Sequence, residues 1–256
     1  MKKIKDELLI ALDFGTTNIK GAVFNINGNE IFLESIEYPL IKIGTIIIEN
    51  DLKKYWEKIF LILKNLSKKL GARCKNVVAI GTTSQGETIV PVNKLGNPLR
   101  NAIVWLDTRT SDEVTELKQN FNINEMYKKT GCSNIDASWP ATRILWMRKN
   151  EPEVFKDTYK FLLIEDFCVH KLSGVFVGES SVYSSSYYYD IFKFDYIDAM
   201  LSYLNIKKNN IPEIVKPGTI IGEITEEIHK QTGFPKNTKV VIGAMDQICG
   251  AWYYHG

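Results

Sequence analysis

Three strand-length apolar segments follow one another near the N-terminus with only tight turns between them. They occupy residues 8–12, 19–25 and 31–38. Asn27-Gly28 is a hairpin signal between the second and third segments. Asp51 then opens an amphipathic helical pattern that Gly71 ends. Three adjacent hairpin strands followed by alternating strands and helices predict an α/β fold, with a mixed sheet and helices on both of its faces.

The rest of the chain continues this alternation of apolar runs and helical patterns. Strands are expected at residues 77–80, 88–92, 102–105 and 239–242, and helices at 111–121, 140–149, 164–172 and 247–254. A length of 256 residues fits one large domain or two small ones. We expect a single domain over residues 1–256 with an insertion at about residues 126–203.

Charge and apolar content exclude several classes of protein. Lys plus Arg total 32 against 30 Asp plus Glu, so there is no basic excess of the kind that nucleic-acid binding needs. No apolar run approaches the ~18 residues of a membrane span. The apolar run at residues 8–12 is too short for a signal peptide and ends at Asp13. We therefore expect a cytoplasmic protein that binds neither nucleic acid nor membrane.

The cysteines and histidines are scattered along the chain. The four cysteines lie far apart and form no Cys-x-x-Cys pair, and the three histidines do not cluster. Zinc sites and redox motifs depend on such spacing. We expect four reduced thiols, mostly buried, and no Ser-His-Asp triad.

A polar turn follows the first strand, in the sequence Asp13-Phe14-Gly15-Thr16-Thr17-Asn18-Ile19-Lys20. It matches neither the Walker A loop nor the dinucleotide-binding fingerprint. Gly15 lets the backbone approach a ligand, and the amides of residues 15–17 can form an anion-binding nest. Asp13 could hold Mg²⁺ through water, and Lys20 could offset phosphate charge. An ordinary hairpin turn is an equally good interpretation of this segment by itself.

Two further polar segments follow buried strands. Gln85-Gly86-Glu87 presents donors and acceptors suited to a polyhydroxy ligand, although a plain polar loop explains it as well. Asp246 and Gln247 stand where a strand ends and a helix begins. A carboxylate placed there stays ionised and can accept a proton, but an N-cap aspartate is the commoner use of such a residue.

Taken together, the three segments resemble the amino-terminal domain of the FGGY family of carbohydrate kinases, which includes xylulokinases, gluconate kinases and glycerol kinases. Residues 12–20 resemble its first phosphate motif. Residues 85–88 and 97–110 resemble the next block, and residues 242–251 resemble the segment that bears the catalytic aspartate. The likeness runs from about Leu9 to the end of the chain.

The resemblance implies a ribonuclease-H-like fold of the actin and hexokinase kind. It also implies phosphoryl transfer from ATP, with Mg²⁺, to a hydroxyl of a sugar or polyol. Asp246 would be the general base and Asp13 the residue that orients the metal. The remaining roles would be phosphate contacts by Gly15, Thr16, Thr17 and Lys20, and sugar contacts by Gln85, Gly86, Glu87, Trp139 and Gln247.

Two departures from the family bear on the substrate and on activity. Gly86-Glu87 stands where glycerol kinases have Arg-Glu and xylulokinases have Met-His, and Ser138-Trp139-Pro140 replaces a Tyr-Phe-Ser of glycerol kinases. We therefore expect a xylulokinase-like sugar or sugar-alcohol kinase and leave the sugar open. Family members are about twice as long, so we expect this chain to lack the carboxy-terminal ATP-binding domain and to be almost inactive by itself. That domain and a sugar are the expected partners, and a homodimer stays open.

Three other functions compete with the kinase. A non-catalytic sugar-binding or regulatory module derived from the kinase domain fits a chain that lacks half of the enzyme. A nuclease could gather two metal ions with Asp13, Glu87 and Asp246, but the near-neutral charge is against it. A glycosidase could use paired carboxylates, yet it leaves the Gly-Thr-Thr turn unexplained. The aromatic runs 187–189 and 252–254 are expected in the core or at an interface with the second domain.

Overall fold

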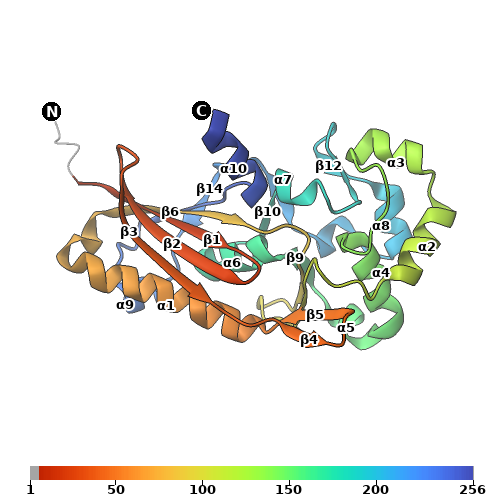
Figure 1. Cartoon of the computed structure of the whole chain (residues 1–256), viewed down its shortest axis with the longest axis horizontal. Helices are drawn as coiled ribbons and strands as arrows, with labels where there is room; N and C mark the ends of the chain where they lie inside the picture. Colours follow the sequence, from red (N-terminus) through yellow and green to blue (C-terminus); the bar gives the residue numbers. More distant parts are fainter. Residues whose placement is uncertain (1–5, 256) are drawn as a thin grey trace.

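A six-stranded mixed sheet forms one half of the molecule in the computed structural model, which describes residues 6–255 and the side chains of residues 6–252 (Figure 1). The strand order is β14-β15-β6-β1-β2-β3. These strands are β1 (Leu8–Phe14), β2 (Asn18–Asn25), β3 (Glu30–Glu37), β6 (Val77–Ser84), β14 (Ile220–Glu223) and β15 (Lys239–Val241). β1, β2 and β3 pair antiparallel, β14 pairs antiparallel with β15, and the central neighbours β1, β6 and β15 run parallel.

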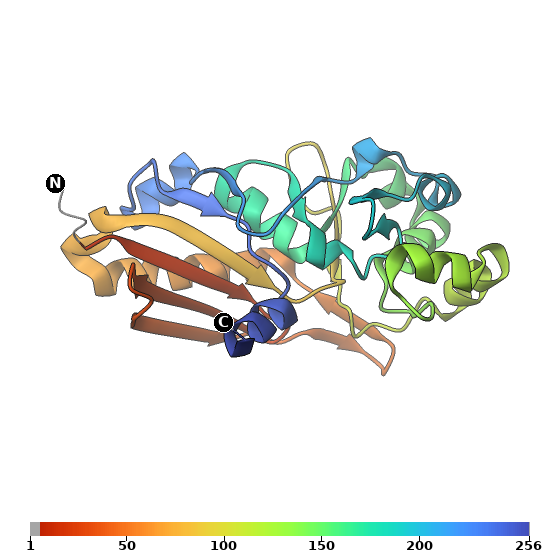
Figure 2. The same cartoon turned by 90° about the horizontal axis from the view of Figure 1, so that it is seen from above.

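Three helices bury one face of this sheet. They are α1 (Leu52–Leu70), α6 (Ile164–Ser173) and α9 (Glu226–Thr232). In β1, Leu8, Ile10 and Leu12 are buried among these helices, whereas Leu9 is 38% exposed on the opposite face. Figures 1 and 2 place α10 (Asp246–His255) on the side of the sheet away from α1. Because strand side chains alternate with a period of two, Asp13 shares the face of Leu9, where α10 begins.

A second apolar cluster fills the other half of the molecule. A five-stranded sheet in the order β4-β5-β8-β7-β9 connects the two halves: β4 (Ile41–Ile43), β5 (Ile47–Asn50), β7 (Ile89–Val92), β8 (Ala102–Ile103) and β9 (Lys160–Leu163). The helices around the second cluster are α2 (Ser111–Asn120), α3 (Ile123–Thr130), α4 (Pro140–Asn150), α5 (Pro152–Asp157), α7 (Ser180–Tyr183) and α8 (Asp198–Leu204). Two small strand pairs complete it: β10 (Val177–Glu179) with β13 (Glu213–Val215), and β11 (Tyr189–Asp190) with β12 (Asp195–Tyr196). Short 3₁₀ helices are η1 (Gly71–Asn76) and η2 (Lys208–Asn210).

The predicted α/β architecture is confirmed, and local signals explain most of its boundaries. The Asp51 carboxylate caps α1 by accepting a hydrogen bond from the Lys54 amide at 3.2 Å. The strand expected at 102–105 stops at Ile103, because the next residues turn into the loop that leads to α2. β4 and β5 lie in a segment for which no strand was predicted. The single domain with an insertion at about 126–203 stays a prediction.

The aromatic and sulfur-bearing residues divide between core and surface. Tyr187, Tyr188 and Tyr189 are buried in the second cluster, as the sequence predicted, whereas Trp252 is 78% exposed. The side chains of residues 253 and 254 fall outside the described part. Three cysteines are buried and Cys249 is exposed, all as free thiols. No helix within residues 6–255 combines the length and the apolar character needed to cross a bilayer.

Candidate functional site

The three polar segments singled out in the sequence meet at one edge of the six-stranded sheet. Phe14 at the end of β1 pairs with Ser84 at the end of β6, and a parallel bridge joins Ser84 to Met245. Asp13, Gln85 and Asp246 each lie one residue from these paired positions. In open α/β sheets, ligands bind outside the carboxyl ends of the strands. The structure therefore brings the turn after β1, the segment after β6 and the start of α10 to a common edge.

Two tyrosine side chains hold the turn at residues 15–17 in place. Tyr38 and Tyr55 donate hydrogen bonds from their hydroxyls to the Gly15 carbonyl oxygen, at 3.1 and 3.2 Å. A Cβ at Gly15 would lie 2.5 Å from the Asn18 carbonyl oxygen, so the turn is too tight for any other residue. Thr17 is exposed at its tip. Such a turn presents its amides to an anion without needing to rearrange.

Thr16 connects this turn to the other two parts of the site. Its hydroxyl donates to Oε1 of Gln85 at 2.9 Å and accepts from Nε1 of Trp105 at 2.9 Å. Gln85 is buried, and its amide group also donates to the Gly15 carbonyl oxygen at 3.3 Å. Oε1 of Gln85 also accepts from the Thr88 hydroxyl at 3.0 Å. In the structure, the Gln85 side chain therefore binds the turn and Thr88, and a contact to sugar stays a prediction.

Asp13 and Lys20 form an ion pair across the β1–β2 hairpin. Nζ of Lys20 lies 3.4 Å from Oδ2 of Asp13, and the two side chains are 52% and 30% exposed. Burial raises the pKa of Asp13, Lys20 lowers it, and repulsion from Asp246 raises it again. The pairing of Phe14 with Ser84 and of Ser84 with Met245 places Asp13 and Asp246 at the same edge of the sheet rather than on opposite sides of the molecule.

The donor set around Asp13 suits Mg²⁺. The half-buried carboxylate of Asp13 offers hard oxygen atoms, which Mg²⁺ prefers. No group of three or more His, Cys, Asp or Glu side chains gathers as a metal site within residues 6–252. Mg²⁺ needs no such cage, because it is usually held by one or two carboxylates, by water and by substrate phosphates.

Asp246 is exposed at the first turn of α10, and the loop before it is fixed. The Gly243 amide donates to the Thr82 hydroxyl at 3.3 Å, and the Met245 amide donates to the Ser181 hydroxyl at 2.9 Å. Those two hydroxyls donate in turn to the buried carboxylates of Glu165, at 2.7 Å, and Glu179. Gln247 is also exposed, and its backbone N–H donates to Oδ1 of Asp246 at 2.7 Å.

Glu87 has a strained backbone and a half-buried carboxylate. Its φ of 56° lies in the left-handed region, which is uncommon for a residue other than glycine. Burial raises the pKa of the Glu87 carboxyl, a hydrogen bond from Ser185 and the charge of Arg143 lower it, and Asp246 raises it. Strain and a perturbed carboxyl in one residue are common at functional sites. The preceding residue, Gly86, is buried, and a Cβ atom there would lie 3.0 Å from Sδ of Met245.

A cavity of about 400 Å³ lies close to Gly86, because Ser185 lines it and a Cβ on Gly86 would lie 3.8 Å from Oγ of Ser185. Trp139, Asp136, Asn134 and Ser185 are among the residues that line it. Nε1 of Trp139 is buried without a hydrogen-bond partner in the described structure, and the Trp139 ring packs 6.3 Å from that of Tyr187. An unpartnered donor beside a polar cavity is suited to a hydroxylated ligand. A cavity of about 480 Å³ lined by Lys160 and Phe194 contains none of the predicted site residues.

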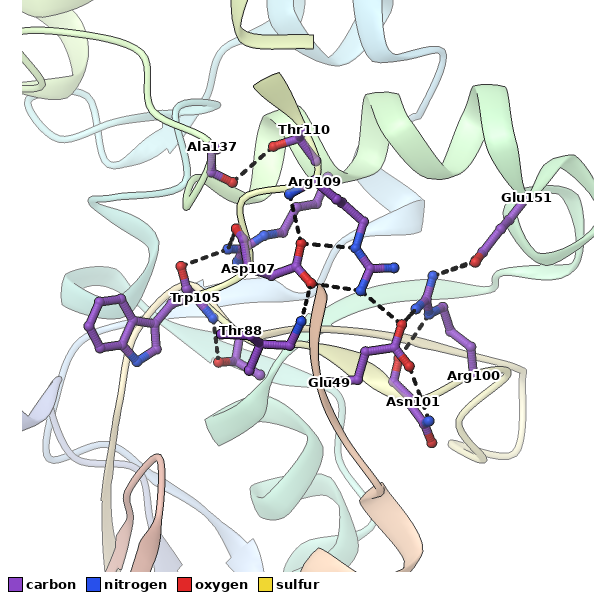
Figure 3. A network of polar contacts seen from close by, with 12 residues as sticks. Glu49, Thr88, Arg100, Asn101, Trp105, Asp107, Arg109, Thr110, Ala137 and Glu151 are labelled. Atoms are coloured by element: carbon purple, nitrogen blue, oxygen red, sulfur yellow. Dashed lines mark hydrogen bonds and ion pairs between the residues drawn. The ribbon is translucent and has the colours of Figure 1, made fainter. Parts of the chain in front are cut away.

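A network of ion pairs supports the loop that carries Trp105, and the sequence interpretation did not assign it a role (Figure 3). Asp107 is fully buried and pairs with Arg109 at 2.6 Å. Glu49 of β5 accepts from Arg109 at 2.9 Å and also from Arg100. Asp107 and Arg109 lie in the block that resembles the family, whereas nothing in the sequence around Glu49 pointed to it.

Comparisons with known proteins agree with this geometry. A family model described as "FGGY family of carbohydrate kinases, N-terminal domain" matches residues 8–252. The chain is 28% identical to a xylulose kinase of Staphylococcus xylosus over 95% of its own length and 50% of that protein's. It is also 28% identical to a glycerol kinase of Thermococcus onnurineus, over 87% of the chain and 46% of the relative. The chain thus spans about half the length of the curated relatives it matches.

A solved structure shows the same fold. The crystal structure of a gluconate kinase from Lactobacillus acidophilus superimposes with a TM-score of 0.87 at 27% identity, covering 94% of this chain and 48% of that one. The ribonuclease-H-like fold class expected from the three motifs is thereby confirmed.

Proposed function

The chain belongs to the FGGY family of carbohydrate kinases, and from that premise we propose that it is the sugar-binding half of an ATP-dependent kinase. Its reaction would transfer the γ-phosphate of ATP to a hydroxyl group of a sugar or sugar alcohol. One observation carries this proposal: Phe14 pairs with Ser84 and Ser84 bridges to Met245, so the segments that bear Asp13, Gln85 and Asp246 meet at one edge of the sheet. The turn at residues 15–17, which would be the phosphate turn, and the segment 85–87, which would contact the sugar, therefore adjoin the exposed carboxylate of Asp246.

Asp246 is the residue best placed to act as general base. Its carboxylate is exposed, and its loop is fixed by hydrogen bonds to the hydroxyls of Thr82 and Ser181. It would accept the proton of the attacking hydroxyl group. A positioned base typically contributes a factor of about 10²–10⁴ in rate, or about 3–5 kcal/mol of the barrier.

The turn at residues 15–17 would hold the transferring phosphate. The amides of Gly15, Thr16 and Thr17 supply donors, and Lys20 offsets negative charge. Asp13 would orient Mg²⁺, which when bound neutralises charge on the phosphate oxygens. Catalysis of phosphoryl transfer consists mainly of such positioning and charge stabilisation.

The sugar would occupy the space between Asp246 and the cavity at Trp139. Glu87 would accept hydrogen bonds from its hydroxyls, Nε1 of Trp139 would donate one, and Gln247 would contact it from α10. Buried polar groups that depend on ligand hydroxyls reject analogues that lack them. Glycine at position 86 leaves no arginine beside Glu87, and this favours a xylulokinase-like sugar over glycerol.

Two experiments test the proposal. Xylulose, gluconate and glycerol are added to the chain in turn, and a specific binder should raise its melting temperature. Glu87→Gln should abolish that rise, while Glu153→Gln, in an exposed side chain of α5, should not. If none of these or other sugars and polyols binds, the sugar site is wrong.

The second experiment measures turnover. ATP and sugar are supplied to the chain together with a separately expressed carboxy-terminal kinase domain. Asp246→Asn should lower kcat by about 10²–10⁴ with little change in sugar affinity, whereas Asp112→Asn, also in a first helical turn, should not. Sugar binding without phosphorylation in any combination would favour a non-catalytic sugar-binding module instead.

A further inference from the structure

A buried arginine lies behind the sugar-binding segment, and no function has been assigned to it. Arg143 is in α4, and its side chain is fully buried. Its Nη1 donates to the Glu87 carbonyl oxygen at 2.6 Å. Its Nη2 donates to the carbonyl oxygens of Trp105, at 2.9 Å, and Asp107, at 3.3 Å. One guanidinium thus holds the backbone of two separate segments.

These contacts are unusual for a buried cation. Charged side chains are almost never fully buried unless they are paired. Among the described residues, no carboxylate oxygen lies within ion-pair distance of Arg143, and three backbone carbonyl oxygens take that place. Burial lowers the pKa of Arg143 to about 10, so the guanidinium stays charged near neutral pH. Burying a charge costs free energy unless hydrogen bonds compensate it, and here the three carbonyl oxygens supply them.

The three carbonyl groups belong to residues of the candidate site or beside it. Glu87 is the residue in the left-handed conformation, and Trp105 is the residue whose indole donates to Thr16 of the phosphate turn. Asp107 anchors the Arg109 and Glu49 network (Figure 3). A rigid, planar fork is well suited to fix several acceptors at once, which a single ammonium group cannot do.

We propose that Arg143 is a positioning residue: it holds Glu87 in its strained conformation so that the carboxylate faces the sugar cavity, and through Trp105 it ties that segment to the phosphate turn. This inference rests on the proposed function for the role of Glu87. It assigns to α4 a part in substrate recognition that none of the three sequence motifs contains.

The charge of Arg143 has a second consequence, at the Glu87 carboxyl. The groups that act on that carboxyl come from different elements: Arg143 of α4, Asp246 of α10 and the hydroxyl of Ser185 after α7, with the Cys132 thiol also nearby. Arg143 and Ser185 lower the pKa of Glu87, and Asp246 raises it. Removing the guanidinium should therefore raise the pKa of Glu87, so that sugar binding is lost at a higher pH as the solution is acidified.

The test compares Arg143→Lys and Arg143→Met with Arg148→Lys in the whole 256-residue chain. Arg148 is a matched control, because it lies in the same helix and also donates to a carbonyl oxygen, that of Tyr203, away from the site. Hydrogen exchange is measured first, because it needs no ligand. Both Arg143 variants should accelerate exchange in residues 85–88 and 104–108 by at least about tenfold, and Arg148→Lys should not. Unchanged exchange in Arg143→Lys, which retains the charge and is the variant expected to fold, overturns the proposal.

Binding of xylulose or gluconate, whichever is tighter, is then measured from pH 4 to 8. Arg143→Lys should raise Kd at least about tenfold with an unchanged pH midpoint, and Arg143→Met should also shift that midpoint upward. Equal Kd values and midpoints in wild type and both Arg143 variants would overturn the proposal. Faster exchange in the Arg143 variants of a chain that binds no sugar would instead leave the backbone clamp standing and refute the proposed function.

Discussion

Gly243 is the position at which a single methyl group should do most damage to the site. It connects β15 to α10, and a Cβ there would lie 1.8 Å from the Thr82 carbonyl oxygen. Real Cβ atoms essentially never come within 3.0 Å of another heavy atom, so the loop and β6 would have to separate by at least about 1.2 Å, the difference between those distances. Both contacting parts are backbone, and neither can rotate away.

The cost of Gly243→Ala can be estimated from this overlap. Forcing extra volume into a packed site typically costs about 1–3 kcal/mol of the free energy of unfolding. For a chain of this size, each kcal/mol lowers Tm by about 2–4 °C. The displacement also moves Asp246, three residues further on, and a misplacement of about 1 Å can reduce a reaction rate about 10²-fold.

Urea unfolding followed by circular dichroism provides the assay, with Gly250→Ala as the control. Gly250 lies in α10, and a Cβ there would meet nothing within 4 Å. Alanine should stabilise that helix position by about 0.5–1 kcal/mol. The two glycine variants should therefore change stability in opposite directions. Gly243→Ala with wild-type stability would refute the close approach of the loop to β6.

Two further predictions concern buried and paired carboxyls. Burial raises the pKa of Glu165 well above its ordinary value of 4.5, so the folded chain binds more protons than the unfolded one and wild-type stability should fall as pH rises above 4.5. Glu165→Gln, which can still accept from Thr82, should flatten that decline in urea unfolding at pH 5 to 8; parallel curves for the two proteins would count against it. Lys20→Met should raise the pKa of Asp13, and Asp246→Asn should lower it, as measured by NMR titration of the Asp13 carboxyl. A titration midpoint that neither substitution moves would contradict the placement of Lys20 and Asp246 near Asp13.

Local sequence patterns were sufficient for the elements and for the positions of the polar turns. The alternation of Leu8, Ile10 and Leu12 defines a strand with one buried face, and Asp51 marks the start of α1. These features depend on neighbours within a few residues, so a linear pattern carries them. The strands β4 and β5 were missed because they are only three and four residues long, too short for a clear pattern, and they are stabilised by pairing of β4 with β5 and of β5 with β8.

The site could be predicted only as a set of separate segments. The three motifs identified Asp13, Glu87 and Asp246 as candidate site residues. They did not identify the residues that fix each of these side chains in place. Arg143 lies in the part of α4 that is buried on every side, as are Ala141, Ile144 and Leu145. Helical periodicity separates a buried face from an exposed one, so it could not show that this arginine is buried.

The sequence by itself determined the strands, the helices, the tight turns and the family that they resemble, because these follow from periodicity and from the residues that each turn requires. Only the tertiary structure decided that the ends of β1 and β6 adjoin the start of α10, that Gln85 binds the turn at residues 15–17, and that Arg143 donates to the Glu87 carbonyl oxygen. The reason is that a polar side chain can bind many partners. Which partner it meets depends on how strands that are far apart in the sequence pair with one another.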